Sequence, residues 1–124
     1  PITVHGDGSQ TRSLCYVDDL VEGIWRFLRS DLTGPMNLGS TEEVTMAELA
    51  ELIRSLTGAR SPIVYTERPV DDPENRRPDT SLARDRLGWS PQIPLREGLS
   101  KTIGWIRRDG APEPAEGETL SSPA

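Results

Sequence analysis

The first 20 residues of the chain predict more of its fold than any other segment. Residues 1–5 and 14–17 are rich in β-forming side chains, and the stretch 6–9, Gly-Asp-Gly-Ser, breaks the chain between them. We therefore expect two short strands joined by a turn. Apolar residues then recur at helical spacing up to Leu28, so a helix that begins with Asp18 or Asp19 as its N-cap is predicted next.

The rest of the chain alternates further short strands and helices, which predicts an α/β fold with about four helices. Thr45 and Glu48 have the spacing of a capping box, and Gly58 is placed to end the helix that they begin. Residues 67–78 are polar and contain three prolines, so this loop is expected to be ordered only if something organises it. The other expected elements are strands over 36–38 and 63–65, a helix over 81–87 and a last helix from Pro94 or Leu95 to about Arg108.

Composition limits what the chain can build. It has 124 residues, one domain's worth at most, and only 34% of them are hydrophobic. Large aliphatic side chains are scarce enough that the fold is expected to lean on a partner domain. We expect residues 1–108 to form the ordered portion. Residues 109–124 are rich in Pro, Glu, Ser, Ala and Gly and are expected to be a disordered acidic tail.

Charge and cysteine content argue against several classes of function. A net charge of −6 and a pI of about 4.8 disfavour nucleic acid as a partner, because a phosphate-tracking surface needs a basic stripe. No apolar run approaches the roughly 20 residues that span a bilayer, so no membrane is expected. One cysteine and one histidine leave no internal disulfide and no zinc site, and the acidic run 71–74 lacks further metal ligands. Without a targeting segment, a cytoplasmic location is expected.

Five motifs carry a resemblance to a known family. They are Gly-Ser-Gln-Thr-Arg at 8–12 followed by Tyr-Val-Asp-Asp at 16–19, Gly-Pro-Met-Asn-Leu-Gly at 34–39, Asp-Asp-Pro at 71–73, Arg-Arg-Pro-Asp at 76–79 and Leu-Gly-Trp-Ser-Pro at 87–91. In these motifs the chain resembles the NAD-dependent nucleotide-sugar epimerase/dehydratase family, the extended short-chain dehydrogenase/reductases. The resemblance extends to Arg108, and within the family it is strongest to the UDP-glucuronate decarboxylases, which make UDP-xylose.

The resemblance implies that this chain is the C-terminal, substrate-binding part of a longer enzyme. The family's glycine-rich NAD turn and its Tyr-x-x-x-Lys pair do not occur in the sequence. We therefore expect no catalytic and no NAD-binding residue in this chain, and NAD bound by a missing N-terminal part. The chain alone is expected to be inactive.

The same resemblance implies UDP-binding roles for residues at both ends of the segment. Thr3 and His5 match a strand beside the uracil, where main-chain groups bond the ring edge and an aromatic stacks on its face; the family often has Tyr or Phe in place of His5. Gln10 and Arg12 lie two residues apart, so they leave the same face of an extended segment. Arg12 is implied to bind the pyrophosphate, and the alternative for it is a surface arginine paired with an acid.

A second implied site lies at 76–79. Arg76 matches the arginine that reaches the pyrophosphate, and Asp79 matches the aspartate that accepts from the ribose hydroxyls. Two arginines from separate segments can clamp a diphosphate through bidentate hydrogen bonds. Asp79 has an alternative role as the cap of the following helix. Arg77 is expected to face solvent or pack in the loop.

For the full-length parent, the resemblance implies a homodimeric enzyme. It would oxidise UDP-glucuronate at C4 with NAD, release CO2 and return the hydride. Two alternatives within the family stay open, a dTDP-glucose 4,6-dehydratase and a UDP-sugar 4-epimerase. From a different class, a non-catalytic nucleotide-sugar binding module is also open.

Overall fold

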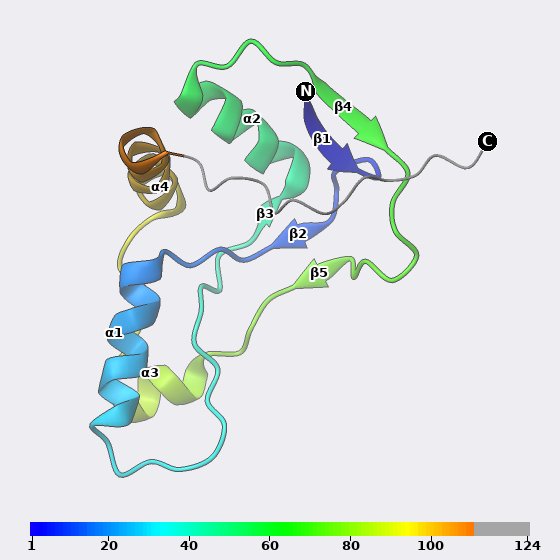
Figure 1. Cartoon of the computed structure of the whole chain (residues 1–124). Helices are drawn as coiled ribbons and strands as arrows, with labels where there is room; N and C mark the ends of the chain where they lie inside the picture. The colour runs from blue at the N-terminus through cyan, green and yellow to red at the C-terminus, as the bar shows by residue number, and fades with distance from the viewer. Residues whose placement is uncertain (111–124) are drawn as a thin grey trace, which may run out of the picture.

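The computed structural model describes residues 1–110, which form an α/β arrangement with four helices and short strands (Figure 1). The predicted fold class is therefore confirmed. Of the predicted tail, residues 111–124 lie outside the described residues. The elements are β1 (Ile2–His5), β2 (Thr11–Arg12), α1 (Val17–Leu28), β3 (Val44–Thr45), α2 (Met46–Thr57), β4 (Ile63–Thr66), β5 (Asn75–Arg76), α3 (Ser81–Leu87) and α4 (Leu95–Asp109).

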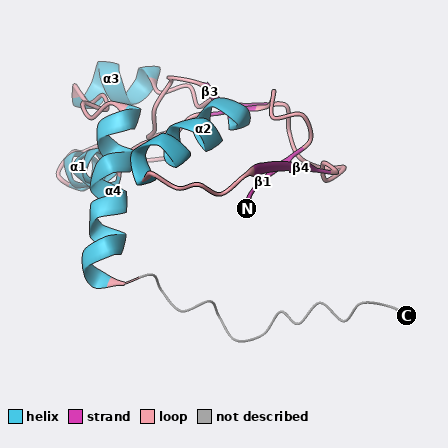
Figure 2. Ribbon diagram, turned by 90° about the horizontal axis from the view of Figure 1, so that it is seen from above, coloured by secondary structure: helices cyan, strands magenta, loops and turns pink. Residues whose placement is uncertain are grey.

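Two small sheets organise the chain. β1 and β4 pair in parallel with Ile2 opposite Ile63, and α2 packs beside them. In the second sheet β2 is central, with β3 antiparallel on one side and β5 parallel on the other. Figure 1 shows the β1–β4 pair and α2 at one end of the molecule, α1 and α3 at the other, and the second sheet between them. Viewed from above, α4 crosses between α1 and α2 (Figure 2).

The capping box predicted to begin α2 and the glycine predicted to end it are confirmed. Thr45 Oγ1 accepts the N–H of Glu48 at 3.1 Å, and the Glu48 carboxylate accepts the N–H of Thr45 at 3.0 Å, so the capping box is complete. Gly58 follows α2 with a φ of 68°, and Gly88 follows α3 with a φ of 60°. Both are left-handed conformations that glycine adopts without strain.

Two predicted strands are wrong. The second strand is not at 14–17: β2 covers Thr11–Arg12, and Val17 already belongs to α1. β2 is short and polar, so it has no apolar alternation to reveal it, and it exists because its backbone pairs with β3 and β5. Residues 36–38 form no strand either. The strand predicted at 63–65 is confirmed as β4.

The predicted aspartate N-cap of α1 is also wrong. Tyr16 is the N-cap residue and makes no side-chain cap bond. Asp19 lies inside the first turn and is buried, and its Oδ2 accepts the N–H of Ile93 at 2.8 Å. The carboxylate therefore ties α1 to the segment that leads into α4 instead of capping its own helix.

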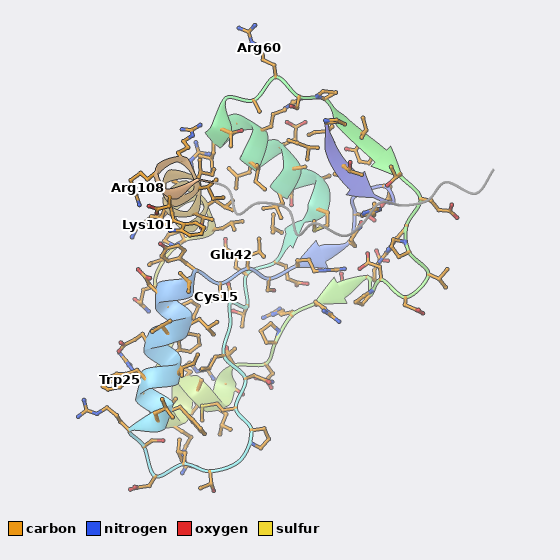
Figure 3. All side chains as sticks on the ribbon, in the orientation of Figure 1. Cys15, Trp25, Glu42, Arg60, Lys101 and Arg108 are labelled. Atoms are coloured by element: carbon orange, nitrogen blue, oxygen red, sulfur yellow. The ribbon has the colours of Figure 1, made fainter. Side chains whose placement is uncertain are left out.

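Trp89 forms the core between α1 and α3. Its ring is only 2% exposed, and its Nε1 donates to the Asp19 carbonyl at 2.9 Å. Gly23 makes room for it, since a Cβ at Gly23 would lie 2.9 Å from Trp89 Cε2. Trp25 and Trp105, in contrast, are 54% and 50% exposed, and Trp25 projects away from the body of the molecule (Figure 3). Within residues 1–110 no helix combines the length and apolar character needed to cross a bilayer.

Candidate functional site

The structure places Arg12 and Arg76 next to each other. They are direct partners in the parallel pairing of β2 with β5. Partners at the same register of neighbouring strands project from the same face of the sheet. Two guanidinium groups from distant parts of the chain therefore share one face, as a diphosphate clamp requires.

The guanidinium of Arg12 is held by three oxygens. Its Nη2 forms an ion pair with the Asp72 carboxylate, and its Nη1 donates to the carbonyls of Thr11 at 2.6 Å and Pro73 at 3.0 Å. The alternative of an arginine paired with an acid is thus present in the structure. Within residues 1–110 no partner contacts Arg12 Nε, and the exposed Arg76 side chain makes no hydrogen bond or ion pair.

The loop from 67 to 76 is organised by a second arginine, which the sequence reasoning missed. Arg68 donates through Nε to Asp72 Oδ2 at 3.2 Å, through Nη2 to the Asp72 carbonyl at 2.9 Å and through Nη1 to Glu74 at 2.7 Å. The hydrogen bond to Glu74 is the main reason that the pKa of Arg68 is raised. The acidic run 71–74 thus supplies arginine partners, and no group of metal-ligating side chains gathers within the described residues.

Thr3 and His5 lie on the exposed side of β1, whereas Val4 between them is buried. The His5 ring is tied to the end of β4, with Nδ1 at 3.0 Å from Thr66 Oγ1 and 3.3 Å from the Glu67 carbonyl. Both predicted uracil-binding residues are therefore on one accessible strand face.

Gln10 is buried, with 2% of its surface exposed. Its Nε2 donates to the His5 carbonyl at 2.6 Å, which joins the end of β1 to the start of β2. Its Oε1 is buried and has no hydrogen-bond partner among the described residues. A buried acceptor without a donor is uncommon in native proteins, and a ligand or a water can satisfy it.

Asp79 lies where the chain enters α3. Its Oδ1 accepts from the Ser81 hydroxyl at 2.7 Å and from the Ser81 N–H at 3.0 Å, and these bonds lower the pKa of Asp79. Asp79 also lines an open hollow of about 420 Å³ together with Arg77 and Arg84, whereas Arg76 does not line it. The structure therefore joins Arg76 to Arg12 and not to Asp79.

A second, larger hollow was not foreseen from the sequence. It has a volume of about 600 Å³ and lies between the entry to α1 and the face of α4. Cys15 stands where the chain enters α1 (Figure 3), and burial, followed by the charge of Asp19, raises the pKa of its thiol. The other lining residues are largely apolar and include Leu14, Ile93, Leu99 and Trp105.

Comparisons with known proteins agree with one another. The family model described as GDP-mannose 4,6 dehydratase matches residues 1–102. UDP-glucuronic acid decarboxylase 1 of Danio rerio is 48% identical over 108 residues, 87% of this chain and 26% of the relative. UDP-glucuronic acid decarboxylase 6 of Arabidopsis thaliana is 49% identical over 98 residues, 79% of this chain and 29% of the relative. The chain thus spans little more than a quarter of the length of these relatives.

Solved structures show the same fold. UDP-glucose 4-epimerase from Thermotoga maritima, solved with UDP-glucose, superposes with a TM-score of 0.82 and 29% identity, covering 87% of this chain and 35% of that one. UDP-glucuronic acid 4-epimerase from Bacillus cereus, solved with UDP-glucuronic acid and NAD, gives a TM-score of 0.78 and 25% identity, covering 86% of this chain and 35% of that one.

Proposed function

Because the chain belongs to the family that the GDP-mannose 4,6 dehydratase model describes, we propose that it is the substrate-binding portion of a longer nucleotide-sugar enzyme. The activity that we propose for that enzyme is UDP-glucuronate decarboxylation, which yields UDP-xylose and CO2. Support for this choice within the family comes from the identities of 48% and 49% to UDP-glucuronic acid decarboxylases.

The observation that carries the proposal is the pairing of Arg12 with Arg76 across β2 and β5. A nucleoside diphosphate carries about two negative charges, and guanidinium groups bind such oxygens through paired, charge-assisted hydrogen bonds. Arg76 and part of Arg12 have N–H groups without a partner among the described residues. In the proposal these two side chains clamp the diphosphate of the UDP-sugar.

The other predicted residues complete the proposed UDP site. Thr3 and His5 offer a strand edge and a ring for the uracil. The Gln10 side chain donates to the main-chain carbonyl of His5 and so helps to fix the position of His5. Asp79 has one oxygen bound to Ser81, and its other oxygen can accept from a ribose hydroxyl. This portion would use contacts remote from the reacting carbon to hold the hexuronate in place.

The described residues do not fit an NAD site. A dinucleotide fold places its glycine turn between a strand and the N-terminus of a helix. The glycine turn after β1 leads into β2 and not into a helix. The turn does contact the N-terminus of α2, but the N–H groups there already have partners in the protein: Met46 N–H donates to the Gln10 carbonyl and Ala47 N–H to the Gly8 carbonyl, both at 3.0 Å. NAD would therefore be held by the part of the enzyme outside this chain.

The apolar surface of α1 supports a larger enzyme. Val17, Val21, Ile24 and Leu28 recur every three or four residues along one stripe and are 45–70% exposed. Soluble monomers rarely leave so continuous a stripe in water. We propose that the remaining three quarters of the enzyme cover this stripe. The proposed enzyme is a cytoplasmic homodimer.

The direct test is to incubate the full-length protein with NAD and UDP-glucuronate and to identify the product. UDP-xylose and CO2 are the expected result. UDP-galacturonate would instead identify an epimerase, and turnover of dTDP-glucose a dehydratase. Tight binding of UDP-glucuronate with no turnover of any of these sugars would identify a binding module and overturn the proposed activity.

A further inference from the structure

We infer that Asp72 is a positioning residue for the UDP site: its carboxylate fixes the guanidinium of Arg12 so that the remaining N–H groups of Arg12 face the diphosphate. The inference rests on the proposed function, in which Arg12 binds that diphosphate. Asp72 itself touches no ligand in this scheme.

The N–H groups of Arg12 are divided between the protein and a free edge. A guanidinium has five N–H donors in a fixed plane. The two N–H groups of Nη1 donate to the carbonyls of Thr11 and Pro73, and one of the two N–H groups of Nη2 donates to the Asp72 carboxylate. Because Asp72 and Pro73 are neighbours in the chain, they hold the Nη1–Nη2 end of the plane. The edge shared by Nε and Nη2 remains for a pair of phosphate oxygens.

Asp72 is itself fixed from its other side. Its Oδ2 accepts from Arg68 Nε at 3.2 Å, and its carbonyl accepts from Arg68 Nη2 at 2.9 Å. Glu74 in turn holds Arg68 Nη1 at 2.7 Å. The side chains of Arg12, Asp72 and Arg68 are only 21–25% exposed, so water competes less for this pair than for an ion pair on the open surface.

Charge balance gives Asp72 a second effect on the same site. Arg12 and Arg76 share one face of the sheet, and Arg68 approaches from the loop. Asp72 and Glu74, two carboxylates among these three guanidinium groups, lower the mutual repulsion of the guanidinium groups while leaving a net positive charge for the ligand. A carboxylate that merely filled the ligand's place would be displaced by a diphosphate. The two main-chain carbonyls on Nη1 hold the same end of Arg12 and cannot leave, which favours positioning over competition.

The test is a double-mutant cycle on UDP binding in the full-length enzyme, measured by calorimetric titration. The proteins are wild type, Asp72→Asn, Arg12→Ala and the double variant. We expect Asp72→Asn to weaken UDP binding roughly three- to tenfold in the wild-type background and less than about twofold in the Arg12→Ala background, because coupled residues are non-additive. KM for UDP-glucuronate should rise with kcat little changed.

Two further variants separate the carboxylate's role from the loop's stability. Asp72→Glu keeps the charge and should retain more affinity than Asp72→Asn. Glu74→Gln alters a carboxylate that contacts Arg68 and not Arg12, so it should weaken UDP binding less than Asp72→Asn does. Thermal unfolding of each variant shows whether the protein is folded at the titration temperature. If Asp72→Asn is unfolded at that temperature, the comparison of Asp72→Glu with Glu74→Gln provides the test.

Several outcomes would overturn the inference. Tighter binding of UDP by Asp72→Asn would show that Asp72 competes with the phosphate. Equal weakening in both Arg12 backgrounds, or an equally large effect of Glu74→Gln, would reduce Asp72 to a general support of the loop. If Arg12→Ala alone bound UDP normally, the proposed role of Arg12 would fail first, and the inference with it.

Discussion

Arg12 and Arg76 are opposite each other on β2 and β5, and among residues 1–110 partners anchor the side chain of Arg12 but not that of Arg76. The two halves of the proposed clamp therefore differ in mobility. Arg12 is fixed by one carboxylate and two carbonyls, whereas the exposed Arg76 side chain must be ordered by the ligand. Ordering a long side chain costs conformational entropy, which lowers the gain from its contact.

Removing either arginine should weaken binding of UDP as well as of UDP-sugar, because both are assigned to the diphosphate. In the full-length enzyme Arg12→Ala and Arg76→Ala are each expected to lower UDP affinity about ten- to a hundredfold by calorimetric titration. Arg77→Ala is the matched control, since Arg77 lines the hollow beside Asp79 and lies 4.0 Å from Glu43. If Arg77→Ala proved damaging and Arg76→Ala harmless, the assignment would move by one residue and Asp79 would lose its ribose role.

Gly23 and Gly104 should respond in opposite directions to the same substitution. A Cβ at Gly23 would lie 2.9 Å from Trp89 Cε2 and 3.1 Å from Leu38 Cδ2, so Gly23→Ala should lower the melting temperature. Within the part of the chain that the structure describes, a Cβ at Gly104 in α4 would have only the tip of Arg108 near it, at 3.5 Å. Gly104→Ala should therefore raise stability by up to about 1 kcal/mol through helix propensity. Chemical denaturation measures both. A stabilising Gly23→Ala would contradict the packing described for Trp89.

Asp19→Ala should destabilise the protein because it leaves the Ile93 N–H without its acceptor. The expected loss is about 1–3 kcal/mol in the free energy of unfolding, the cost of leaving a partly buried donor unsatisfied. Asp18→Ala, at the exposed neighbouring position, is the control and should change stability little. Similar losses from the two substitutions would mean that both act through the charge at the start of α1, as in the capping role predicted from the sequence.

The capping box of α2 should give the protein an acid-sensitive component. Hydrogen bonds from the Thr45 N–H and hydroxyl lower the pKa of Glu48, so the folded state favours its charged form. That contribution is present above the ordinary pKa of about 4.5 and is lost as the pH falls through the lowered folded value. Denaturant unfolding at pH 7 and pH 3 should show a loss for Glu48→Gln at pH 7 that shrinks at pH 3. Glu42→Gln, at an exposed position before β3, should show no such change.

Local signals account for the parts of the fold that the sequence predicted well. The box of Thr45 and Glu48, and the glycines after α2 and α3, act within one helical turn, and the structure has each of them. Elements fixed by distant partners were missed. β2 is two polar residues held by backbone pairing, and Asp19 looks like a cap until the N–H of Ile93 is seen beside it.

The residues of the candidate site also divide into those that sequence motifs predict and those whose contacts only the structure shows. Arg12 and Arg76 were chosen from sequence motifs, but nothing in those motifs shows that the two residues are partners across a sheet. Asp72 and Arg68 stand in a polar stretch of alternating charge, where any acid can pair with any base. Only the path of the loop selects the Asp72 contacts with both arginines.

The contacts that hold the molecule together join its beginning to its end. Arg12 reaches Asp72 across 60 residues, Arg26 reaches the Gly88 carbonyl across 62, and Asp19 reaches Trp89 and Ile93 across 70 and 74. Such non-local pairing slows folding, because the entropy of closing long loops is lost before the stabilising contacts form. On the ribosome, at roughly 5–20 residues per second, β1 and α1 would wait on the order of several seconds for these partners. During that interval β1 lacks its partner strand β4 and Asp19 lacks the N–H of Ile93, so both are open to other chains, and expression yield should depend on how fast the later segment is translated.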